Sequence, residues 1–416
     1  MKRSIKLALA AAVALSGTAA FATNGDHLIG LGAKARGMGG VNVGVSHGAE
    51  SALANPALIT SVEGTEVSFG GTVFMPKVST NFGAGYADSA ADLSVIPEVA
   101  IGQKASENFY WGIGMFGTAG MGTDYRDATG NTANFNMVTN LQLMQFGVPM
   151  AYKVDGFSVG VTPILQYGSL DINYKGNLDA TNMSMGYPAV SGGAGVAQDL
   201  GFGYTAGVAL EMSDLTLGAS YKSAIDMEYK GQLTGALKAF QNFGLLTSMT
   251  SDHLEQPAEI GVGASYKMAG NTFAIDYKQI KWSDAKGYKD FGWENQNVLA
   301  LGYQFAQDNW ALRAGYNHAK NPIKEHSAAG AAGGNGAALN MFNLLGFPAT
   351  IVTHYTVGAS YGFSKTTSLD LAYVYAPEVT DTYSMAAFAG FGPMNPTSIS
   401  TKHSQTSGSA QLNFKF

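Results

Sequence analysis

The chain has 416 residues, of which only 13% are charged, and it contains 54 Gly, 20 Tyr and no Cys. The charged fraction is about half that of an ordinary soluble domain, and a formal net charge of −6 argues against a nucleic-acid partner. Without cysteine, the fold can depend neither on disulfides nor on a Cys-ligated metal.

Residues 1–22 are expected to be a cleaved secretory signal peptide. A basic start, nine uninterrupted apolar residues and an A-x-A cleavage site follow one another: Lys2, Arg3 and Lys6, then 7–15, then Ala20, Phe21 and Ala22. A start-transfer membrane helix is the alternative, but it would need about 20 apolar residues. Cleavage removes three basic residues and no acid, so the mature chain would begin at Thr23 and its net charge would change from −6 to −9.

The next segment, residues 23–64, is glycine-rich and shows no strand alternation. It has seven glycines between residues 30 and 48. A unit of about 40 residues does not usually fold alone without disulfides or a metal. We therefore expect it to be a hatch packed inside a larger fold. A disordered periplasmic tail is the alternative, and the many Leu, Ile, Val and Met residues disfavour it.

Residues 65–416 predict an all-β fold, a transmembrane antiparallel β-barrel. Large apolar residues alternate with small or polar ones in five clear segments: 157–168, 202–212, 258–267, 310–317 and 355–363. A soluble β-sandwich alternates similarly, but outward faces that end in Tyr, Phe or Trp are typical of membrane girdles. After residue 22 no apolar run approaches 18 residues, and besides helices only closed barrels satisfy their backbone groups in lipid.

The connections between these segments predict 14 strands. Six short turns are expected at 106–108, 155–156, 213–214, 269–271, 307–309 and 364–366, and seven long loops at 78–92, 124–139, 175–201, 230–256, 281–293, 319–351 and 377–402. This alternation is typical of periplasmic turns and extracellular loops. The chain closes on Phe416 after an alternating strand, which resembles the signature that the barrel assembly machinery reads; an ordinary last strand is the alternative.

The tripeptide Asn55-Pro56-Ala57 closes the glycine-rich segment and resembles the hatch motif of the FadL family of outer-membrane transporters of hydrophobic compounds. Residues 23–25 and 36–40 look like the same family's hatch, and 237–245 is similar to an amphipathic helix in its fourth extracellular loop. The resemblance implies a passive, ligand-gated channel in the outer membrane of a Gram-negative cell. Its substrates would be long-chain fatty acids or aromatic or aliphatic hydrocarbons.

The resemblance also implies a low-affinity groove between the third and fourth long loops and a tighter site near the start of the hatch. Groove candidates are Leu237, Phe240, Phe243, Leu245, Leu246 and Met249 in loop four, and Met183, Met185 and Tyr187 in loop three. The alternative is that these side chains only pack the loops together. A third apolar cluster lies in loop six, at 341–347.

The resemblance further implies that an inward kink of the third strand opens a lateral exit into the membrane. That strand is expected within 109–123, and Gly117, Gly120 and Gly122 are the candidates for the bend. Asn55 and Pro56 are expected to be structural rather than ligand-binding. Lys34, Arg36, Arg126 and Lys238 could attract a carboxylate, while basic residues in a plug commonly pair with lumen acids.

The seven histidines show no metal spacing, so no metal or cofactor is predicted. Expected partners are the hydrophobic substrate, outer-membrane lipid and lipopolysaccharide, and the chain is expected to be monomeric. A lipid-acting outer-membrane enzyme is the alternative of a different class, although an enzyme would not need a plug. A general porin or an adhesin is the other alternative, and a porin would show charged constriction residues.

Overall fold

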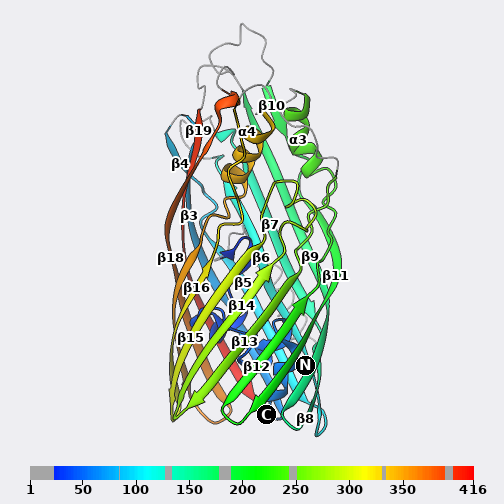
Figure 1. The fold of residues 1–416 in the computed structure, drawn as a ribbon, viewed down its shortest axis with the longest axis vertical. Helices are drawn as coiled ribbons and strands as arrows, with labels where there is room; N and C mark the ends of the chain where they lie inside the picture. The colour runs from blue at the N-terminus through cyan, green and yellow to red at the C-terminus, as the bar shows by residue number, and fades with distance from the viewer. Residues whose placement is uncertain are drawn as a thin grey trace.

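The computed structural model describes residues 23–83, 85–126, 134–177, 189–242, 251–329, 334–388 and 397–416; the expected signal peptide at 1–22 lies outside them. Fourteen antiparallel strands form a closed barrel, in which the first strand pairs with the last (Figure 1). In chain order they are β3 (Thr65–Asn81), β5 (Ser94–Lys104), β6 (Phe109–Asp124), β7 with β8 (Val138–Gly147 and Met150–Val154), β9 (Phe157–Asn177), β11 (Ala197–Met212), β12 (Leu215–Lys222), β13 (Glu259–Met268), β14 (Asn271–Ile280), β15 (Gln296–Gln307), β16 (Trp310–Ala319), β17 (Thr353–Gly362), β18 (Thr367–Ser384) and β19 (Ser398–Lys415).

The five segments with clear alternation lie in strands, except for the end residues Ala258 and Phe363, and the large residues of each face outward. In β11, for example, Phe202 and Tyr204 are exposed while Thr205 is buried. The alternation of large apolar with small or polar residues ends at the six short turns. Asp155, Ser213, Ala269 and Asp308 each begin a turn with a positive φ of 46° to 55°. Two of them are followed by glycine, as tight turns between antiparallel strands favour.

Several expected loop limits are wrong, because strands continue beyond the membrane. The loops expected at 175–201 and 377–402 are shorter, since β9 and β11 reach Asn177 and Ala197 and β18 and β19 reach Ser384 and Ser398. Above the hydrocarbon both faces of a strand meet polar surroundings, so the apolar alternation disappears while the backbone ladder continues. The fourth loop is longer than expected, because β12 already ends at Lys222.

Pro163, inside β9, is accommodated by a break in the neighbouring strand. On one side β9 pairs with β7 up to Gly147 and with β8 from Met150. Pro163 has no backbone N–H, and its carbonyl accepts a hydrogen bond from the N–H of Val148 at 3.2 Å, in the gap between β7 and β8.

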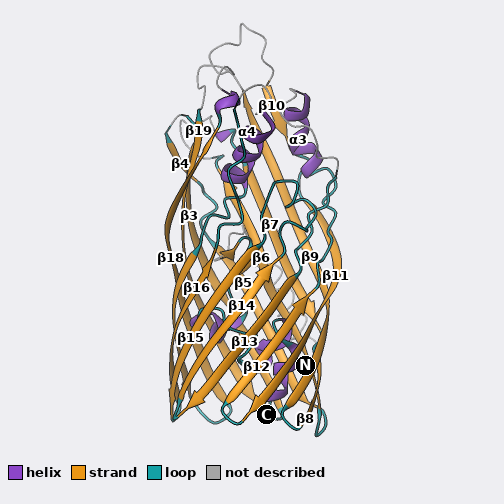
Figure 2. Cartoon of the chain, viewed as in Figure 1, coloured by secondary structure: helices purple, strands orange, loops and turns teal. Residues whose placement is uncertain are grey.

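The long loops gather at the end of the barrel opposite the short turns (Figure 2). They carry four helical segments: α3 (Leu233–Asn242), α4 (Gly334–Met341), a π-helical turn η6 (Phe342–Gly346) and a short 3-10 turn η7 (Ala386–Phe388). Two short strands, β4 (Tyr86–Asp88) and β10 (Ala189–Gly192), pair antiparallel with the ends of β3 and β9 there. Among the residues that the structure describes, no helix is long and apolar enough to cross a membrane.

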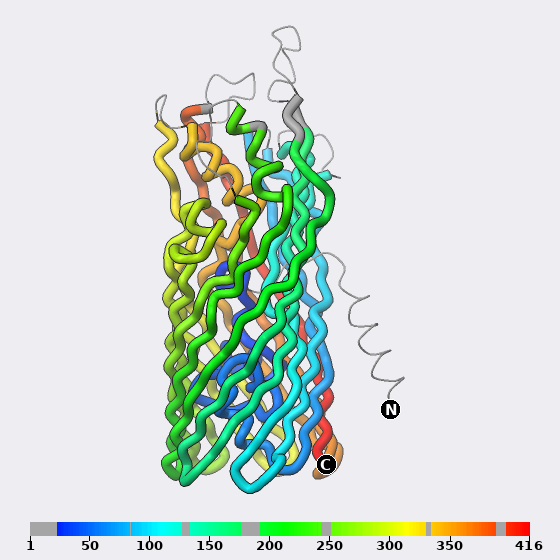
Figure 3. Tube along the Cα trace, turned by 90° about the vertical axis from the view of Figure 1, so that its right-hand side faces the viewer, coloured from blue at the N-terminus to red at the C-terminus, as the bar shows by residue number. Residues whose placement is uncertain are grey.

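The N-terminal segment, residues 23–64, lies inside the ring of strands (Figure 3). It contains a small hairpin of β1 (Thr23–Asn24) and β2 (His27–Leu28), then α2 (Gly32–Gly37) and two 3-10 turns, η1 (Gly48–Leu53) and η2 (Pro56–Ser61). Wall glycines allow its backbone to approach closely. A Cβ added to Gly315 would lie 2.0 Å from the nitrogen of Gly39, and one added to Gly218 would lie 1.9 Å from the carbonyl oxygen of Val43.

Polar groups of the wall hold the same segment. The carboxylate of Asp276 on β14 accepts three successive backbone N–H groups, those of Asn42, Val43 and Gly44, at 2.6, 2.8 and 3.1 Å. Arg36 donates two hydrogen bonds to Glu98 on β5, at 2.8 and 2.5 Å. Such paired, charge-assisted contacts fix the orientation of a segment as well as its position.

Candidate functional site

Below the long loops, aromatic and aliphatic side chains from four of them meet in one buried cluster. Phe240 of α3 packs edge-on against Phe342 of η6, with ring centroids 5.2 Å apart, and lies 5.9 Å from Tyr174 of β9. Phe291 of the fifth loop lies 6.4 Å from Phe342. Leu237 and Phe240 are fully buried. In this state both make the loop-packing contacts that the sequence left open beside a ligand groove.

The remaining groove candidates belong to the parts of loops three and four that the structure does not describe. Phe243, Leu245, Leu246 and Met249 of loop four, and Met183, Met185 and Tyr187 of loop three, lie outside the described residues.

Loop six reaches down from the cluster and is bound to the wall. Carbonyl groups of Leu344, Leu345 and Gly346 accept hydrogen bonds from the hydroxyls of Thr401, Thr123 and Thr139, at 2.8, 2.9 and 2.5 Å. These threonines belong to three strands, β19, β6 and β7. The apolar residues of this loop are therefore part of the roof of the lumen.

A narrow pocket lies within this cluster. Leu233, Leu254, Tyr288, Phe291, Trp293 and Phe347 line it, and it has about 10 Å³ of free space. That volume is close to the room for a single water molecule. A hydrophobic ligand could enter only if these side chains moved apart.

The N-terminal hairpin joins this cluster from below. Trp282 of the fifth loop lies against Gly25, where an added Cβ would be 2.5 Å from the indole ring. The ring centroids of Trp282 and His27 are 5.1 Å apart. The hydroxyl of Tyr288 donates a hydrogen bond to Asp26, and Gln256 donates another at 3.1 Å. Burial raises the pKa values of both Asp26 and Tyr288. The start of the segment is thus bound directly to loops four and five.

The opposite side of the same hairpin contacts β6, the third strand of the barrel. His27 pairs with Ala119, and the N–H of Gly120 donates to the carbonyl of Asp26 at 3.0 Å. Among the described pairs, β5 pairs with β6 only between Glu98 and Lys104, and the ladder between β6 and β7 is irregular between Gly117 and Ala119. Of the three candidate glycines, the irregularity begins at Gly117; Gly120 and Gly122 lie beyond it.

The side chain of Ile96 on β5 lies against Gly117 on β6, where the two strands have separated. A Cβ added to Gly117 would lie 2.6 Å from Cγ2 of Ile96. Ile96 belongs to a small buried cluster with Leu28, Ile29, Phe74 and Val374. The separation between β5 and β6 is therefore closed by apolar side chains, two of which belong to the N-terminal segment.

A second, polar pocket lies beside the hairpin, between the N-terminal segment and β12 to β14. It measures about 40 Å³, and Lys222, Lys278, Glu259, His27 and Thr118 are among its lining residues. Lys278 lies 3.9 Å from Glu259. Sequence reasoning missed both lysines, although the alternation of β14 could have placed Lys278 on the inward face with Asp276.

The basic residues proposed for carboxylate capture have acidic neighbours. Arg36 is bound to Glu98, Lys34 lies 3.1 Å from Glu50 and 3.6 Å from Asp370, and Arg126 lies 2.5 Å from Asp124. Lys238 is exposed on α3. For Lys34 and Arg36 this is the pairing with lumen acids that the sequence left open.

Asn55 begins η2 and connects it to the wall. Its side-chain oxygen accepts the N–H of Ala57 at 3.2 Å, and its amide nitrogen donates to the carbonyls of Val43 and Val208 at 2.9 and 3.2 Å. Pro56 occupies the first position of the turn, where the lack of an N–H is harmless. These contacts give the Asn55-Pro56-Ala57 motif a structural role.

No feature of the described chain favours enzymatic chemistry. The nucleophile-elbow pattern G-x-S-x-G occurs three times, at 44–48, 156–160 and 358–362, but none of these copies lies in a strand-to-helix turn. Ser360 sits within β17, bound to Arg313 and Asp370. The described residues contain no cluster of three metal-ligating side chains.

Comparison with known proteins agrees with the geometry. The model of the family described as "Outer membrane protein transport protein (OMPP1/FadL/TodX)" matches residues 7–416. Outer membrane protein P1 of Haemophilus influenzae is 23% identical over 388 residues, which cover 80% of this chain and 81% of that protein. A 47 kDa outer membrane protein of Pasteurella multocida is 24% identical over 209 residues, 44% of this chain and 45% of that protein.

Solved structures share the fold at low sequence identity. A FadL homologue from Pseudomonas aeruginosa superposes with a TM-score of 0.69 at 15% identity, covering 94% of this chain and 100% of that one. The toluene transporter TodX of Pseudomonas putida gives a TM-score of 0.66 at 16% identity, covering 93% and 99%. With a family match over nearly the whole chain, this protein belongs to the OMPP1/FadL/TodX family of outer-membrane transport proteins and resides in the outer membrane of a Gram-negative cell.

Proposed function

We propose that the protein is a passive, ligand-gated channel for small hydrophobic molecules, either long-chain fatty acids or aromatic or aliphatic hydrocarbons. The observation that carries this proposal is the position of the N-terminal hairpin. One side of it contacts the aromatic cluster below the loops, and the other contacts the point at which β6 separates from β5. Displacement of the hairpin from the aromatic cluster would therefore also alter its contacts with β6.

Capture would begin in the loops. Leu237 and Phe240 of α3 and Phe342 of η6 are buried against one another, and they would offer the first large apolar surface below the extracellular end when the loops part. A ligand that leaves water there gains about 25 cal/mol for each Å² of apolar surface that it buries. To enter more deeply it must replace side-chain contacts in the pocket that Tyr288, Phe291 and Trp293 line.

Residues 23–64 would act as the hatch, and only the start of this segment would need to move. The hairpin is held by Tyr288, Gln256 and the ring of Trp282, whereas the later part is held by Asp276 and Glu98 through several charge-assisted bonds. Ligand binding between loops four and five would compete with the first set of contacts and leave the second in place.

Exit would be lateral. Displacement of Leu28 would remove one of the side chains that pack against Ile96 in the separation between β5 and β6. A hydrophobic molecule could then pass into the membrane without crossing the aqueous periplasm. The charged contacts that hold the later part of the hatch favour this route over passage through the periplasmic end.

The lysines beside the hairpin allow an amphipathic substrate. Lys222 and Lys278 line a polar pocket in the lumen, where the carboxylate of a fatty acid would find cationic partners. A hydrocarbon would use only the apolar cluster above. We also propose that the protein is a monomer that contacts lipopolysaccharide through its loops, and that the assembly machinery recognises the exposed Phe416.

Uptake into proteoliposomes tests the proposal. Vesicles containing the protein should accumulate a labelled fatty acid or a labelled aromatic hydrocarbon faster than protein-free vesicles and should exclude a labelled sugar. Accumulation of the sugar at a comparable rate would indicate a general porin. Chemical conversion of a lipid in the vesicles would indicate an enzyme.

A further inference from the structure

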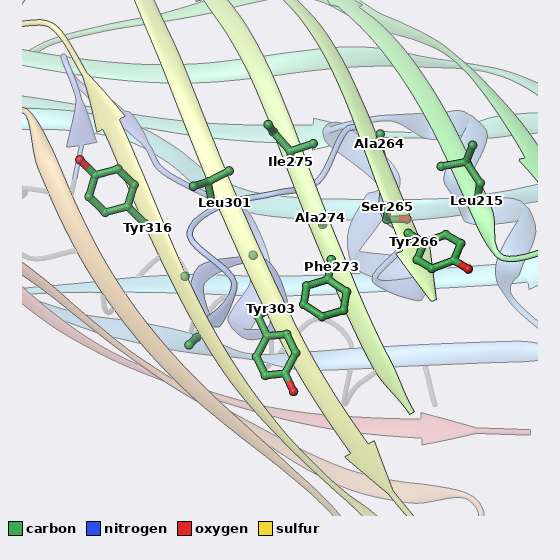
Figure 4. A pocket seen from close by; sticks show the side chains of 13 residues that line it. Leu215, Ala264, Ser265, Tyr266, Phe273, Ala274, Ile275, Leu301, Tyr303 and Tyr316 are labelled. Atoms are coloured by element: carbon green, nitrogen blue, oxygen red, sulfur yellow. The ribbon is translucent and has the colours of Figure 1, made fainter. Parts of the chain in front are cut away.

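A groove opens on the outer wall of the barrel, across β13 to β16 (Figure 4). It has a volume of about 630 Å³. Its sides are formed by Tyr266, Phe273, Ile275, Leu301, Tyr303 and Tyr316, most of which are substantially exposed to the surroundings of the barrel. The groove is separated from the lumen by the strands themselves.

Two alanines create the hollow. Ala264 and Ala314 occupy outward positions of β13 and β16, where the neighbouring outward residues are Val262 and Tyr266 in one strand and Leu312 and Tyr316 in the other. Packing of the N-terminal segment does not require a small side chain at these positions, because they face away from it. Close approach of the N-terminal segment explains only the inward-facing glycines of these strands and not the outward-facing alanines.

The groove lies in the periplasmic half of the membrane. Tyr266 is three residues from the turn residue Ala269, and Tyr303 is four residues from Gln307, where β15 ends. With a rise of about 3.4 Å per residue and a tilt of about 40°, the groove extends from the periplasmic interface to about the bilayer centre. The hydroxyl of Tyr303 donates to Asn271 at 2.7 Å, next to the turn, as expected of an interfacial tyrosine.

We propose that this groove binds one acyl chain of a phospholipid of the periplasmic leaflet. Three observations select this occupant. The groove is continuous with the lipid-facing surface, its lining is almost entirely apolar, and its level excludes lipopolysaccharide, which lies in the other leaflet.

If substrate leaves between β5 and β6, as proposed above, it is not the occupant, because that separation lies on a different part of the wall. The bound acyl chain would contact the outer face of these strands, and the N-terminal segment contacts their inner face. A Cβ added to Gly302 would already lie 2.7 Å from the carbonyl oxygen of Met38 inside the barrel.

Photo-crosslinking tests the proposal. The purified full-length protein is reconstituted in vesicles that contain a phospholipid with a diazirine in the middle of one acyl chain, and adducts are located by mass spectrometry. Labelling of Ile275 and Leu301 should exceed that of Val262 and Val357, two outward residues that do not line the groove. The double variant Ala264→Phe/Ala314→Phe fills the hollow, and Val262→Phe/Val357→Phe is the matched control.

Filling the hollow should lower the labelling of Ile275 and Leu301 about fivefold, which corresponds to about 1 kcal/mol of lost binding at 1.4 kcal/mol per decade. The control should leave it unchanged. Equal labelling of groove and non-groove residues in the wild-type protein would overturn the proposal, as would unchanged labelling after filling. Displacement of the label by a transported hydrophobe would also overturn it, because the occupant would then be substrate.

Discussion

Trp282 covers Gly25 so closely that a Cβ on Gly25 would lie 2.5 Å from Cζ2 of the indole ring, and Gly25 has a φ of +69°. Only glycine adopts this backbone conformation without strain and also fits below the ring. The contact joins the fifth extracellular loop to the N-terminal hairpin. The position is therefore suited to a test of whether the hairpin closes the channel.

Gly25→Ala should release the hairpin. A left-handed conformation costs a residue with a Cβ about 1 to 2 kcal/mol, so the released population should rise about fivefold to thirtyfold. Uptake of a hydrophobic dye and proteolysis near the N-terminus should both increase. Gly235→Ala is the control, because a Cβ there would meet nothing within 4 Å. Unchanged uptake and proteolysis in Gly25→Ala would show that the hairpin is not a closure.

Phe240 in α3 and Phe243, which follows that helix in the sequence, should determine capture. Phe240→Ser/Phe243→Ser removes two aromatic faces, each worth about 1.5 to 3 kcal/mol when fully buried and about half of that in an open groove. Binding of the hydrophobe should weaken by about tenfold to a hundredfold, as measured by fluorescence titration. The exposed Lys238, changed to Ser, is the control on the same helix, with an uncharged hydrocarbon as the ligand.

Folding of the Phe240→Ser/Phe243→Ser variant is checked on gels. A closed barrel should migrate differently before and after boiling in detergent, and the variant should keep this difference. Undiminished binding would exclude the groove assignment, whereas joint loss of binding and of the migration difference would assign the pair to structure.

Glu50 should make the stability of the N-terminal segment depend on pH. Burial raises the pKa of this carboxyl from 4.5 to about 7, even though Lys34 lies 3.1 Å away, because Asp370 and Glu98 add further negative charge. The folded state then holds a proton that the unfolded state has already lost, so stability falls as the pH rises from about 4.5 through 7. At about 1.36 kcal/mol per pH unit, the difference is on the order of 3 kcal/mol.

Glu50→Gln should remove this dependence. The melting temperature of the wild-type protein in detergent should fall between pH 5 and pH 8, and that of the variant should fall less and be the higher of the two at pH 8. If the melting temperatures of the wild-type protein and the variant changed in parallel across this pH range, that result would contradict the role assigned to Glu50.

Gly117 should be sensitive to the size of its side chain. Gly117→Val places methyl groups against Ile96, where a Cβ alone would already lie 2.6 Å from Cγ2, and should lower uptake while assembly continues. The further change Ile96→Ala vacates that space and should restore uptake. Gly120→Val is expected to lower uptake as well. Wild-type uptake by Gly117→Val/Gly120→Val would place the exit elsewhere.

Local patterns predicted the barrel well, because each membrane strand must separate lipid from lumen. The alternation at 202–212, for example, marked the membrane part of β11. Beyond the hydrocarbon that constraint ends, so the extensions of β9 and β18 carried no signal. The glycines of β6 were recognisable as sites for a bend, but only the pairing with β5 shows that the strands separate at Gly117.

The site was less accessible to sequence reasoning. The contacts of Gly25 with Trp282 and of Asp26 with Tyr288 join residues far apart in the chain. The sequence around each of these residues does not indicate which distant residue it contacts. The loop-four run at 237–245 was recognisable as amphipathic, whereas its packing against Phe342 required the path of loop six.

The separation between β5 and β6 can be locked directly. A Cβ built on Gly117 lies 3.8 Å from the Cβ of Ile96, close to the mean separation of about 3.8 Å in disulfides, and the chain contains no cysteine. Ile96→Cys/Gly117→Cys can therefore be oxidised to a single crosslink, with each single variant as a control.

The decisive measurement is the uptake rate of a hydrophobic substrate into proteoliposomes containing Ile96→Cys/Gly117→Cys, before and after reduction. Lateral exit predicts that the oxidised protein takes up no more than protein-free vesicles and that reduction restores transport, while the single variants respond to neither treatment. Equal uptake in both states, with the crosslink verified by mass spectrometry, would contradict exit between β5 and β6.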